Sequence, residues 1–373
     1  MAGTETSSPP PHRLADLETL AKRKLPEHVY NYYRGWAGDG QTARDNCEAF
    51  KRYRLLTRVL RDVSKQDTAV TVLGSILDLP VVIAPTAQHS LAHDDGERAT
   101  AKAAAALNVG MVVSSWASCS IEDISDAAPV GVRWFHLTLQ KDVARNKALL
   151  ARAEKAGCTA VVLTVDQPVA RRLKRTGKLA VAPDDWSLPH MTFGDAPQRG
   201  TVSYGEYIYA CMKQPITWDD VVWTKTNTSL PVVLKGILSA EDAEEAVRRG
   251  VDAICVSNHG GRQLDGVPAT LDVLPDVVRV VGGRLEVYMD GGVRTGADIL
   301  KALALGAKCV FVGRPVLWAL AYQGEDGVRQ ALQVLNDELR VAMAHTGCSR
   351  ISDITRKLLV RESCAGCHLT SKV

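Results

Sequence analysis

The chain has 373 residues, enough for one large domain or two ordinary ones, and its 46% hydrophobic and 23% charged residues are typical of a globular protein. A formal net charge of +3 gives no reason to expect a nucleic acid partner, and no run of about 18 apolar residues predicts a membrane span. These properties favour small-molecule chemistry.

The two ends of the chain differ in composition from its middle. Residues 1–12 combine serine, threonine and proline without periodic apolar positions, which predicts a flexible leader. A helical extension is expected from there to about residue 60. We expect residues 13–361 to form a single domain and residues 362–373 to form a mobile tail.

From about residue 80 onward, short β-branched runs alternate with helical patterns. The runs cover residues 81–85, 111–115, 132–137, 159–166, 231–235, 252–258, 285–290 and 308–314. Between them, apolar residues recur every three or four positions, as in segments 95–107, 143–156, 240–249 and 296–305. Eight such units predict an α/β fold, the (β/α)8 or TIM barrel. The stretch at about 171–216, after the fourth run, predicts a long irregular loop that could form a lid.

Polar residues follow several of these runs, and the carboxyl ends of barrel strands converge on one mouth. His259 can accept a proton near neutral pH, and Arg262 can hold a carboxylate through two parallel hydrogen bonds, which together predict proton abstraction beside a carboxylate. Lys235 ends a run of buried type, where an unpaired ammonium is costly, so we expect an anionic partner. Asp166 either orients His259 or caps the following turn.

Two glycine-rich segments follow the seventh and eighth runs. They are DGGVRTG at 290–296 and FVGRP at 311–315, and both supply flexible backbone and an arginine. Barrels often bind phosphate between these two loops, although a glycine pair alone is more often only a turn. Taken together, the two loops favour a phosphate site.

Eight motifs, in order along the chain, resemble the FMN-dependent α-hydroxy acid oxidases, the glycolate oxidase and 2-hydroxyacid oxidase group. The resemblance runs from about residue 25 to residue 361. Its motifs are LPEHVYNYYR (25–34), IAPTA (83–87), SSWAS (114–118), TVDQP (164–168), LKGIL (234–238), SNHGGRQLDGVPAT (257–270), DGGVRTG (290–296) and ALGAKCVFVGRP (304–315).

The resemblance implies FMN as cofactor and an L-2-hydroxy acid as substrate, which is oxidised to the 2-oxo acid while O2 is reduced to hydrogen peroxide. It makes His259 the base, Asp166 its partner, Arg262 the carboxylate clamp and Lys235 the cation beside the flavin N1 and C2 carbonyl. Tyr30 and Trp116 are expected to line the substrate pocket. The other cofactor contacts are expected from Pro85, Thr86, Ala87, Ser114, Thr164 and Ser257, and, around the ribityl hydroxyls and phosphate, from Asp290, Gly291, Gly292, Val293, Arg294, Gly313 and Arg314.

Two departures from the family pattern concern the substrate. The family's Gln-Leu-Tyr is here His136, Leu137 and Thr138. His136 could still bond the flavin edge, but Thr138 is too short to replace the tyrosine hydroxyl, so a water, a larger substrate or reduced activity is expected. The family's Gly-Asn-Arg is here Ala170, Arg171 and Arg172. We expect Arg172 to take the place of the family's carboxylate-binding arginine.

Three alternatives stay open at this point. The chain could be an FMN dehydrogenase with another electron acceptor, an enzyme for an unusual larger hydroxy acid, or an FMN-binding protein that has lost catalysis. A carbanion route and a hydride route both require a base, so the sequence does not separate them.

The remaining predictions concern partners and location. The resemblance implies a homo-oligomer, with tetramers occurring in the family. The CxxCH string at 364–368 resembles a haem c attachment site, but a chance cysteine pair explains it better, and we predict no metal site. The last three residues, 371–373, resemble the SKL peroxisomal signal imperfectly. We therefore expect a peroxisomal protein, or otherwise a cytoplasmic one.

Overall fold

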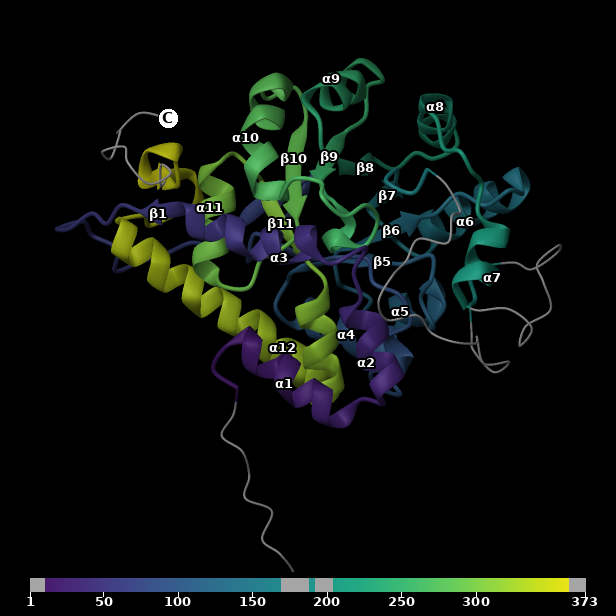
Figure 1. The fold of residues 1–373 in the computed structure, drawn as a ribbon, viewed down its shortest axis with the longest axis horizontal. Helices are drawn as coiled ribbons and strands as arrows, with labels where there is room; N and C mark the ends of the chain where they lie inside the picture. Colours follow the sequence, from purple (N-terminus) through teal and green to yellow (C-terminus); the bar gives the residue numbers. More distant parts are fainter. Residues whose placement is uncertain (1–10, 169–187, 192–203, 362–373) are drawn as a thin grey trace, which may run out of the picture.

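The computed structural model describes residues 11–168, 188–191 and 204–361. Within these residues, parallel strands form a closed barrel in chain order, and the last strand pairs with the first (Figure 1). The barrel strands are β4 (Val81–Ile83), β5 (Gly110–Val113), β6 (Arg133–Leu137), β7 (Ala160–Thr164), β8 (Val232–Ile237), β9 (Ala253–Val256), β10 (Glu286–Asp290) and β11 (Cys309–Val312). The predicted (β/α)8 barrel and its eight strands are confirmed.

A helix follows each barrel strand and leads the chain back to the start of the next. These helices are α4 (Gly96–Ala106), α5 (Ile121–Ala127), α6 (Val143–Lys155), α8 (Trp218–Thr226), preceded by α7 (Tyr204–Cys211), then α9 (Ala240–Arg248), α10 (Thr270–Val281), α11 (Gly296–Ala304) and α12 (Arg314–Thr346). The four segments predicted as helices coincide with α4, α6, α9 and α11. Side chains of Ser120, Asp142, Ser239 and Thr295 accept backbone N–H groups at helix starts, which explains why α5, α6, α9 and α11 begin there.

The interior of the barrel is a packed core. Trp134, Tyr288 and Phe311 lie together inside it, with ring centroids 5.6–5.8 Å apart. A hairpin of β2 (Val70–Val72) and β3 (Ser75–Leu77) packs its buried side chains against the same core. The hairpin's turn donates a backbone N–H to Glu286, the first residue of β10, so it closes the amino-terminal end of the barrel. The carboxyl ends of the strands are left for the site.

The N-terminal extension contains α1 (Leu14–Lys24), α2 (Glu27–Arg34) and α3 (Gln41–Glu48), followed by a 3-10 turn that ends at Arg52. The predicted helical extension is confirmed, but it stops at Arg52 and not near residue 60. Residues 53–55 form β1 (Tyr53–Leu55) instead, which pairs antiparallel with β12 (Leu359–Arg361) at the far end of the described chain. Such a partner cannot be recognised from local sequence.

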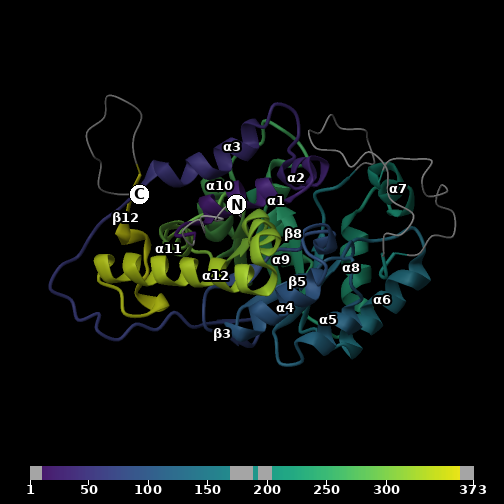
Figure 2. The same ribbon diagram turned by 90° about the horizontal axis from the view of Figure 1, so that it is seen from below.

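The last helix, α12, is bent. It packs against α1, α4 and α11, and Figure 2 shows it running across the molecule between α11 and α4. The bend lies at Gln323 and Gly324, where Gly324 has φ of 57° and a Cβ would lie 2.7 Å from Nε2 of His93. The backbone conformation at Gly324, with φ of 57° and ψ of −133°, is one that glycine adopts readily and other residues do not.

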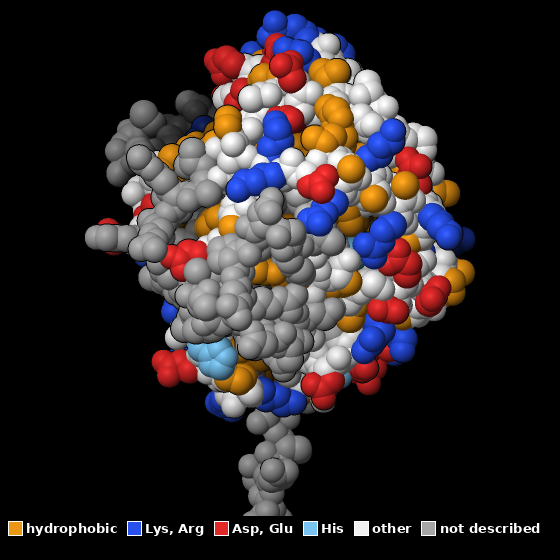
Figure 3. Space-filling view, turned by 90° about the vertical axis from the view of Figure 1, so that its right-hand side faces the viewer, with side chains coloured by type: hydrophobic (Ala, Val, Ile, Leu, Met, Phe, Trp, Pro, Cys, Tyr) orange, Lys and Arg blue, Asp and Glu red, His pale blue; other side chains and the backbone are white. Residues whose placement is uncertain are grey.

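The surface in Figure 3 carries basic and acidic side chains of both signs intermixed over its described part. Among the described residues, no helix combines the length and the apolar character needed to cross a bilayer. Several predictions fall outside the described ranges: the leader up to residue 10, Arg172 with most of the 171–216 loop, the CxxCH string and the three last residues.

Candidate active site

A buried ion pair lies at the carboxyl ends of three neighbouring strands. Nζ of Lys235, in β8, is 2.9 Å from Oδ2 of Asp290, the last residue of β10, and donates a 2.9 Å hydrogen bond to Oγ of Ser257, just after β9. The side chains of Lys235 and Asp290 are only 5% and 9% exposed. Asp290 is thus an anionic partner of Lys235 within the protein, and the role of Lys235 beside the flavin stays a prediction.

Charges around Lys235 keep it ionised. Burial alone, the largest influence, would lower the pKa of Lys235, but the attraction of Asp290, and after it of Asp166, raises that pKa above its ordinary value. A fixed positive charge therefore lies at the barrel mouth. It is the kind of group that stabilises negative charge developing on a bound molecule.

A histidine and a carboxylate are paired beside this lysine. Nδ1 of His259 lies 3.0 and 3.2 Å from the two carboxylate oxygens of Asp166. Burial is the largest influence on the pKa of Asp166 and opposes ionisation, but His259 and then Lys235 lower the pKa overall. An ionised carboxylate only accepts hydrogen bonds, so Nδ1 carries the proton and Nε2 of the neutral ring is the basic atom.

The local backbone makes room for this pair. Gly236, next to Lys235, has φ of 123°, and a Cβ there would lie 2.7 Å from Cβ of Asp166. His259 itself has φ of 56°, in the left-handed region that non-glycine residues seldom adopt, and its N–H donates to Oγ of Ser257. Such conformations are concentrated at functional sites.

His136 lies at the end of β6, in the barrel interior next to these groups. Its Nδ1 accepts the N–H of Ser115 at 3.4 Å, so Nε2 carries the proton and donates to Oγ1 of Thr164 at 2.7 Å. Burial, followed by repulsion from Lys235 and His259, lowers the pKa of His136 to about 3. The imidazole of His136 is therefore neutral across the physiological range.

Replacing His136 with glutamine, the family's residue, should reduce the loss of folding stability that occurs as the pH falls. A histidine whose pKa falls from about 6.5 in the unfolded chain to about 3 in the fold contributes stability above pH 6.5, which is lost as the pH falls towards 3. We expect the melting temperatures of wild type and His136→Gln to diverge in favour of the variant between pH 6.5 and the acid limit of folding. Parallel curves would contradict the buried neutral state.

An apolar cluster lines the mouth near β5 and β6. It joins Trp116 to Leu188, Met191, Tyr207 and Met212, with Tyr32 packed against it. Nε1 of Trp116 donates to Oγ1 of Thr138 at 3.2 Å. Thr138 therefore fixes the indole, and the expected pocket residues Trp116 and Thr138 are in contact.

The tyrosine of α2 that lies at this cluster is Tyr32. The Tyr30 hydroxyl donates to Glu18 in α1 at 3.1 Å, and its ring packs on Trp318 in α12. Two residues along a helix turn through about 200°, so Tyr32 faces the other way, and its ring lies 5.6 Å from the guanidinium of Arg262. The structure thus does not bring Tyr30 to the cluster. Helical geometry separates Tyr30 from Tyr32 within YNYY (30–33), but the local sequence does not show which face of the helix meets the rim.

Arg262 approaches the N-terminal extension. Its Nη1 donates to the backbone carbonyls of Tyr32, Tyr33 and Gly35 at 2.9–3.1 Å. Arg314, at the start of α12, donates to the carbonyls of Tyr33, Gly35 and Gly260. At least one nitrogen of the Arg262 guanidinium is therefore bound to backbone carbonyls. That Arg262 binds the substrate carboxylate stays a prediction.

Three guanidinium groups gather at the ends of β9, β10 and β11. Burial, followed by repulsion from Arg262 and Arg294, lowers the pKa of Arg314 to about 9. Neither Arg294 nor Arg314 forms an ion pair within the described part of the chain. Beside them, Gly313 precedes α12 as its N-cap residue and supplies no side-chain cap, so no cap side chain meets the N–H groups at the start of the helix. This arrangement fits a bound phosphate.

Features of the strand ends also fit the rest of FMN. Oδ1 of Asp290 is buried without a hydrogen-bond partner among the described residues, as expected for an acceptor that meets a hydroxyl group. Gly291 and Gly292, with φ of 94° and 85°, turn the chain directly after it. The predicted cofactor residues lie on the ends of β4, β5, β6, β7, β8, β9, β10 and β11 or directly after them, which is one rim of one barrel.

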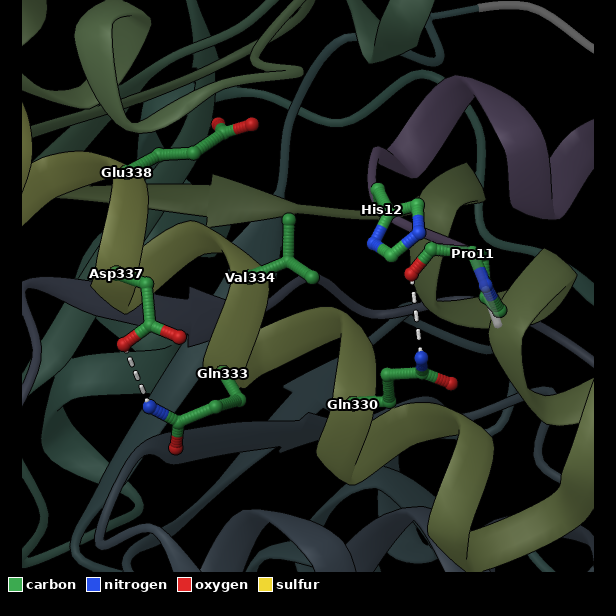
Figure 4. A pocket seen from close by; sticks show the side chains of 7 residues that line it. All are labelled: Pro11, His12, Gln330, Gln333, Val334, Asp337 and Glu338. Atoms are coloured by element: carbon green, nitrogen blue, oxygen red, sulfur yellow. Dashed lines mark hydrogen bonds between the residues drawn. The ribbon is translucent and has the colours of Figure 1, made fainter. Parts of the chain in front are cut away.

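A pocket shown in Figure 4 lies away from this rim. Its volume is about 370 Å³, and it lies where the N-terminal segment meets α12; its lining residues are Pro11, His12, Gln330, Gln333, Val334, Asp337 and Glu338. Gln330 donates to the carbonyl of Pro11, and Glu338 accepts the first N–H of α11. The pocket contains none of the predicted site residues, and its polar groups join neighbouring elements.

Comparisons with known proteins agree with this geometry. The family described as FMN-dependent dehydrogenase matches residues 21–361. 2-Hydroxyacid oxidase 1 of Mus musculus is 45% identical over 357 residues, covering 94% of this chain and 96% of that protein. Glycolate oxidase 2 of Oryza sativa subsp. indica is 46% identical over 354 residues, with 94% and 96% covered.

A solved structure shares the fold as well. The crystal structure of mandelate oxidase with (S)-4-hydroxymandelic acid superimposes with a TM-score of 0.87 at 39% identity, covering 94% of this chain and 98% of that one. Both the family match and the relatives extend over nearly the whole chain. The chain therefore belongs to the FMN-dependent α-hydroxy acid oxidase family, as its motifs predicted.

Proposed function

We propose that this protein uses FMN to oxidise an L-2-hydroxy acid to the 2-oxo acid, with O2 reduced to hydrogen peroxide. The observation that carries the proposal is the His259–Asp166 pair beside the buried Lys235–Asp290 pair on one rim of the barrel. Relatives named 2-hydroxyacid oxidase and glycolate oxidase support the same reaction. The intact His259–Asp166 pair argues against a protein that only binds FMN.

Each charged or titratable residue of the site has its own role in the proposed reaction. Oxidation of a hydroxyl-bearing carbon to a carbonyl removes two electrons and two protons, which together convert O2 to hydrogen peroxide. When bound, FMN supplies the electron transfer. Nε2 of His259 accepts a substrate proton, and the Asp166 carboxylate stabilises the imidazolium that results. Lys235 supplies positive charge where negative charge develops, and Arg262 attracts the substrate carboxylate.

We further propose that the side chain of the substrate is apolar and larger than that of glycolate. Tyr32 and Trp116 form an apolar wall that is backed by the buried Met and Leu side chains of the cluster, and Thr138 is small where the family has tyrosine. Burying an apolar group against such a wall is favourable, by roughly 0.8 kcal/mol for each CH2 group. A glycolate-sized molecule has no side chain to place against that wall.

A panel of 2-hydroxy acids tests both proposals. The purified protein should be yellow with one FMN per chain, and anaerobic mixing with glycolate, a long-chain 2-hydroxy acid and mandelate should bleach the flavin, fastest for the larger acids. Readmitted oxygen should restore the colour with one hydrogen peroxide per turnover. Bleaching without peroxide would indicate a different electron acceptor. A protein that no acid bleaches would refute the proposed reaction.

A further inference from the structure

Helix α3 is joined along its length to the segment that carries His259. At the start of α3, the carboxylate of Asp265 accepts the backbone N–H groups of Asp39, Gln41 and Thr42 at 2.9–3.2 Å. One residue of the first turn, Thr42, donates its hydroxyl to the carbonyl of Val267 at 2.9 Å. The segment from Ser257 to Thr270 is therefore held against a helix of the N-terminal extension.

The innermost contact is a reciprocal pair of amides. Nδ2 of Asn46 donates to Oδ1 of Asn258 at 2.8 Å, and Nδ2 of Asn258 donates to Oδ1 of Asn46 at 2.7 Å. Asn46 is 2% exposed and Asn258 is 3% exposed. Because each side chain both donates to and accepts from the other, the two amide planes fix each other's orientation, and no water competes for them.

Both amides also bind the backbone of the same segment. Oδ1 of Asn258 accepts the N–H of Gly261, and Nδ2 of Asn258 donates to the carbonyl of Pro268. Oδ1 of Asn46 accepts the N–H of Thr270 at 3.4 Å. The pair thus ties together the two ends of the loop that contains His259.

His259 directly follows Asn258, and its backbone needs such support. His259, Gly260 and Gly261 are three consecutive residues with positive φ, of 56°, 63° and 73°. A left-handed conformation costs a non-glycine residue on the order of 1 kcal/mol, so an unsupported loop would relax. The loop also lies close against α3, because a Cβ on Gly261 would lie 2.7 Å from the backbone nitrogen of Ala43 in α3.

We propose that Asn46 is a positioning residue for His259, acting through Asn258. This inference rests on the proposed function, in which His259 is the base. The imidazole must meet Asp166 at Nδ1 and the substrate at Nε2 at the same time, and an error of about 1 Å in such a geometry can cost about a hundredfold in rate. Asn46 holds the backbone from which the ring extends.

The variant Asn46→Leu removes both amide hydrogen bonds with little change in shape. The matched control is Thr42→Val, which removes the bond to Val267. Thr42 is one helical turn earlier on the same face of α3, is fully buried, and contacts the same segment without touching Asn258. If Asn46→Leu does not fold, Asn46→Ser removes the amide pair with a smaller polar side chain.

Both variants are compared as FMN-loaded protein by melting temperature, by the rate constant of anaerobic flavin reduction and by NMR of histidines labelled with 15N. We expect the Asn46 variant to lose reduction rate by roughly tenfold to a hundredfold and to shift the ring signals of His259, which are assigned with His259→Asn. The control should keep its rate within about twofold and leave those signals in place.

Two outcomes would overturn the inference. One is unchanged His259 signals in the Asn46 variant, and the other is an equal loss of rate in Thr42→Val, which would indicate general loosening of α3. Failure of the proposed reaction would look different. No hydroxy acid would then bleach even the wild-type protein, and the His259 signals would still report whether Asn46 positions the ring.

Discussion

Replacing His259 with alanine should leave a yellow protein with its full FMN content whose flavin is no longer bleached by any 2-hydroxy acid. The substitution removes the imidazole, whose Nδ1 contacts Asp166 and whose Nε2 is the basic atom, and loss of a positioned base costs about 10²–10⁴-fold in rate. The cofactor groups on β8, β10 and β11 are untouched. Stopped-flow measurement of flavin absorbance under anaerobic conditions gives the rate.

Two comparisons make this result specific. His28 is exposed on α2, and His28→Ala should react like the wild type. Asp166→Asn keeps the imidazole but removes the charge that stabilises its protonated form, so its rate should fall between those of wild type and His259→Ala. Rapid and complete bleaching of His259→Ala would show that another group accepts the proton.

The barrel could be predicted because each strand is buried on both faces. Strands of that kind are continuous apolar runs, and β4 to β11 are buried at nearly every position, so periodicity alone separates them from the amphipathic helices. The hairpin of β2 and β3 and the pairing of β1 with β12 could not be predicted. The hairpin turn is Leu73-Gly74, which lacks the usual Asn-Gly signal, and β1 depends on a partner at the far end of the chain.

The residues of the candidate site also fall into those that could be predicted from the sequence and those that could not. Residues on strand ends were found from the sequence because the topology of a barrel brings them to one rim, and the partner of Lys235 proved to be one of them, Asp290. Contacts made by the N-terminal extension were missed. Tyr32 and Asn46 reach the rim only because α2 and α3 fold over it, and no local pattern in the sequence reports where a separate helix will lie.

The second large effect is expected from Lys235→Met. This change leaves the carboxylate of Asp290 buried without its counter-charge, and breaking one partner of a buried ion pair costs about 3–5 kcal/mol. The midpoint of urea unfolding should therefore fall sharply. Flavin content should fall as well, because Asp290 and Lys235 are both on the cofactor rim, and absorbance of the purified protein measures it.

A second lysine of the same chain serves as a control that distinguishes the effect of burial from the effect of ion pairing on stability. Lys225 lies 3.1 Å from Asp252, but both side chains are partly exposed, so Lys225→Met should cost less than about 1 kcal/mol. In Lys235→Met combined with Asp290→Leu neither charge of this pair remains, so part of the lost stability should return while the FMN content stays low. If the two single lysine variants unfold at the same urea concentration, the Lys235–Asp290 pair does not have the low-dielectric surroundings that the proposed role of Lys235 requires.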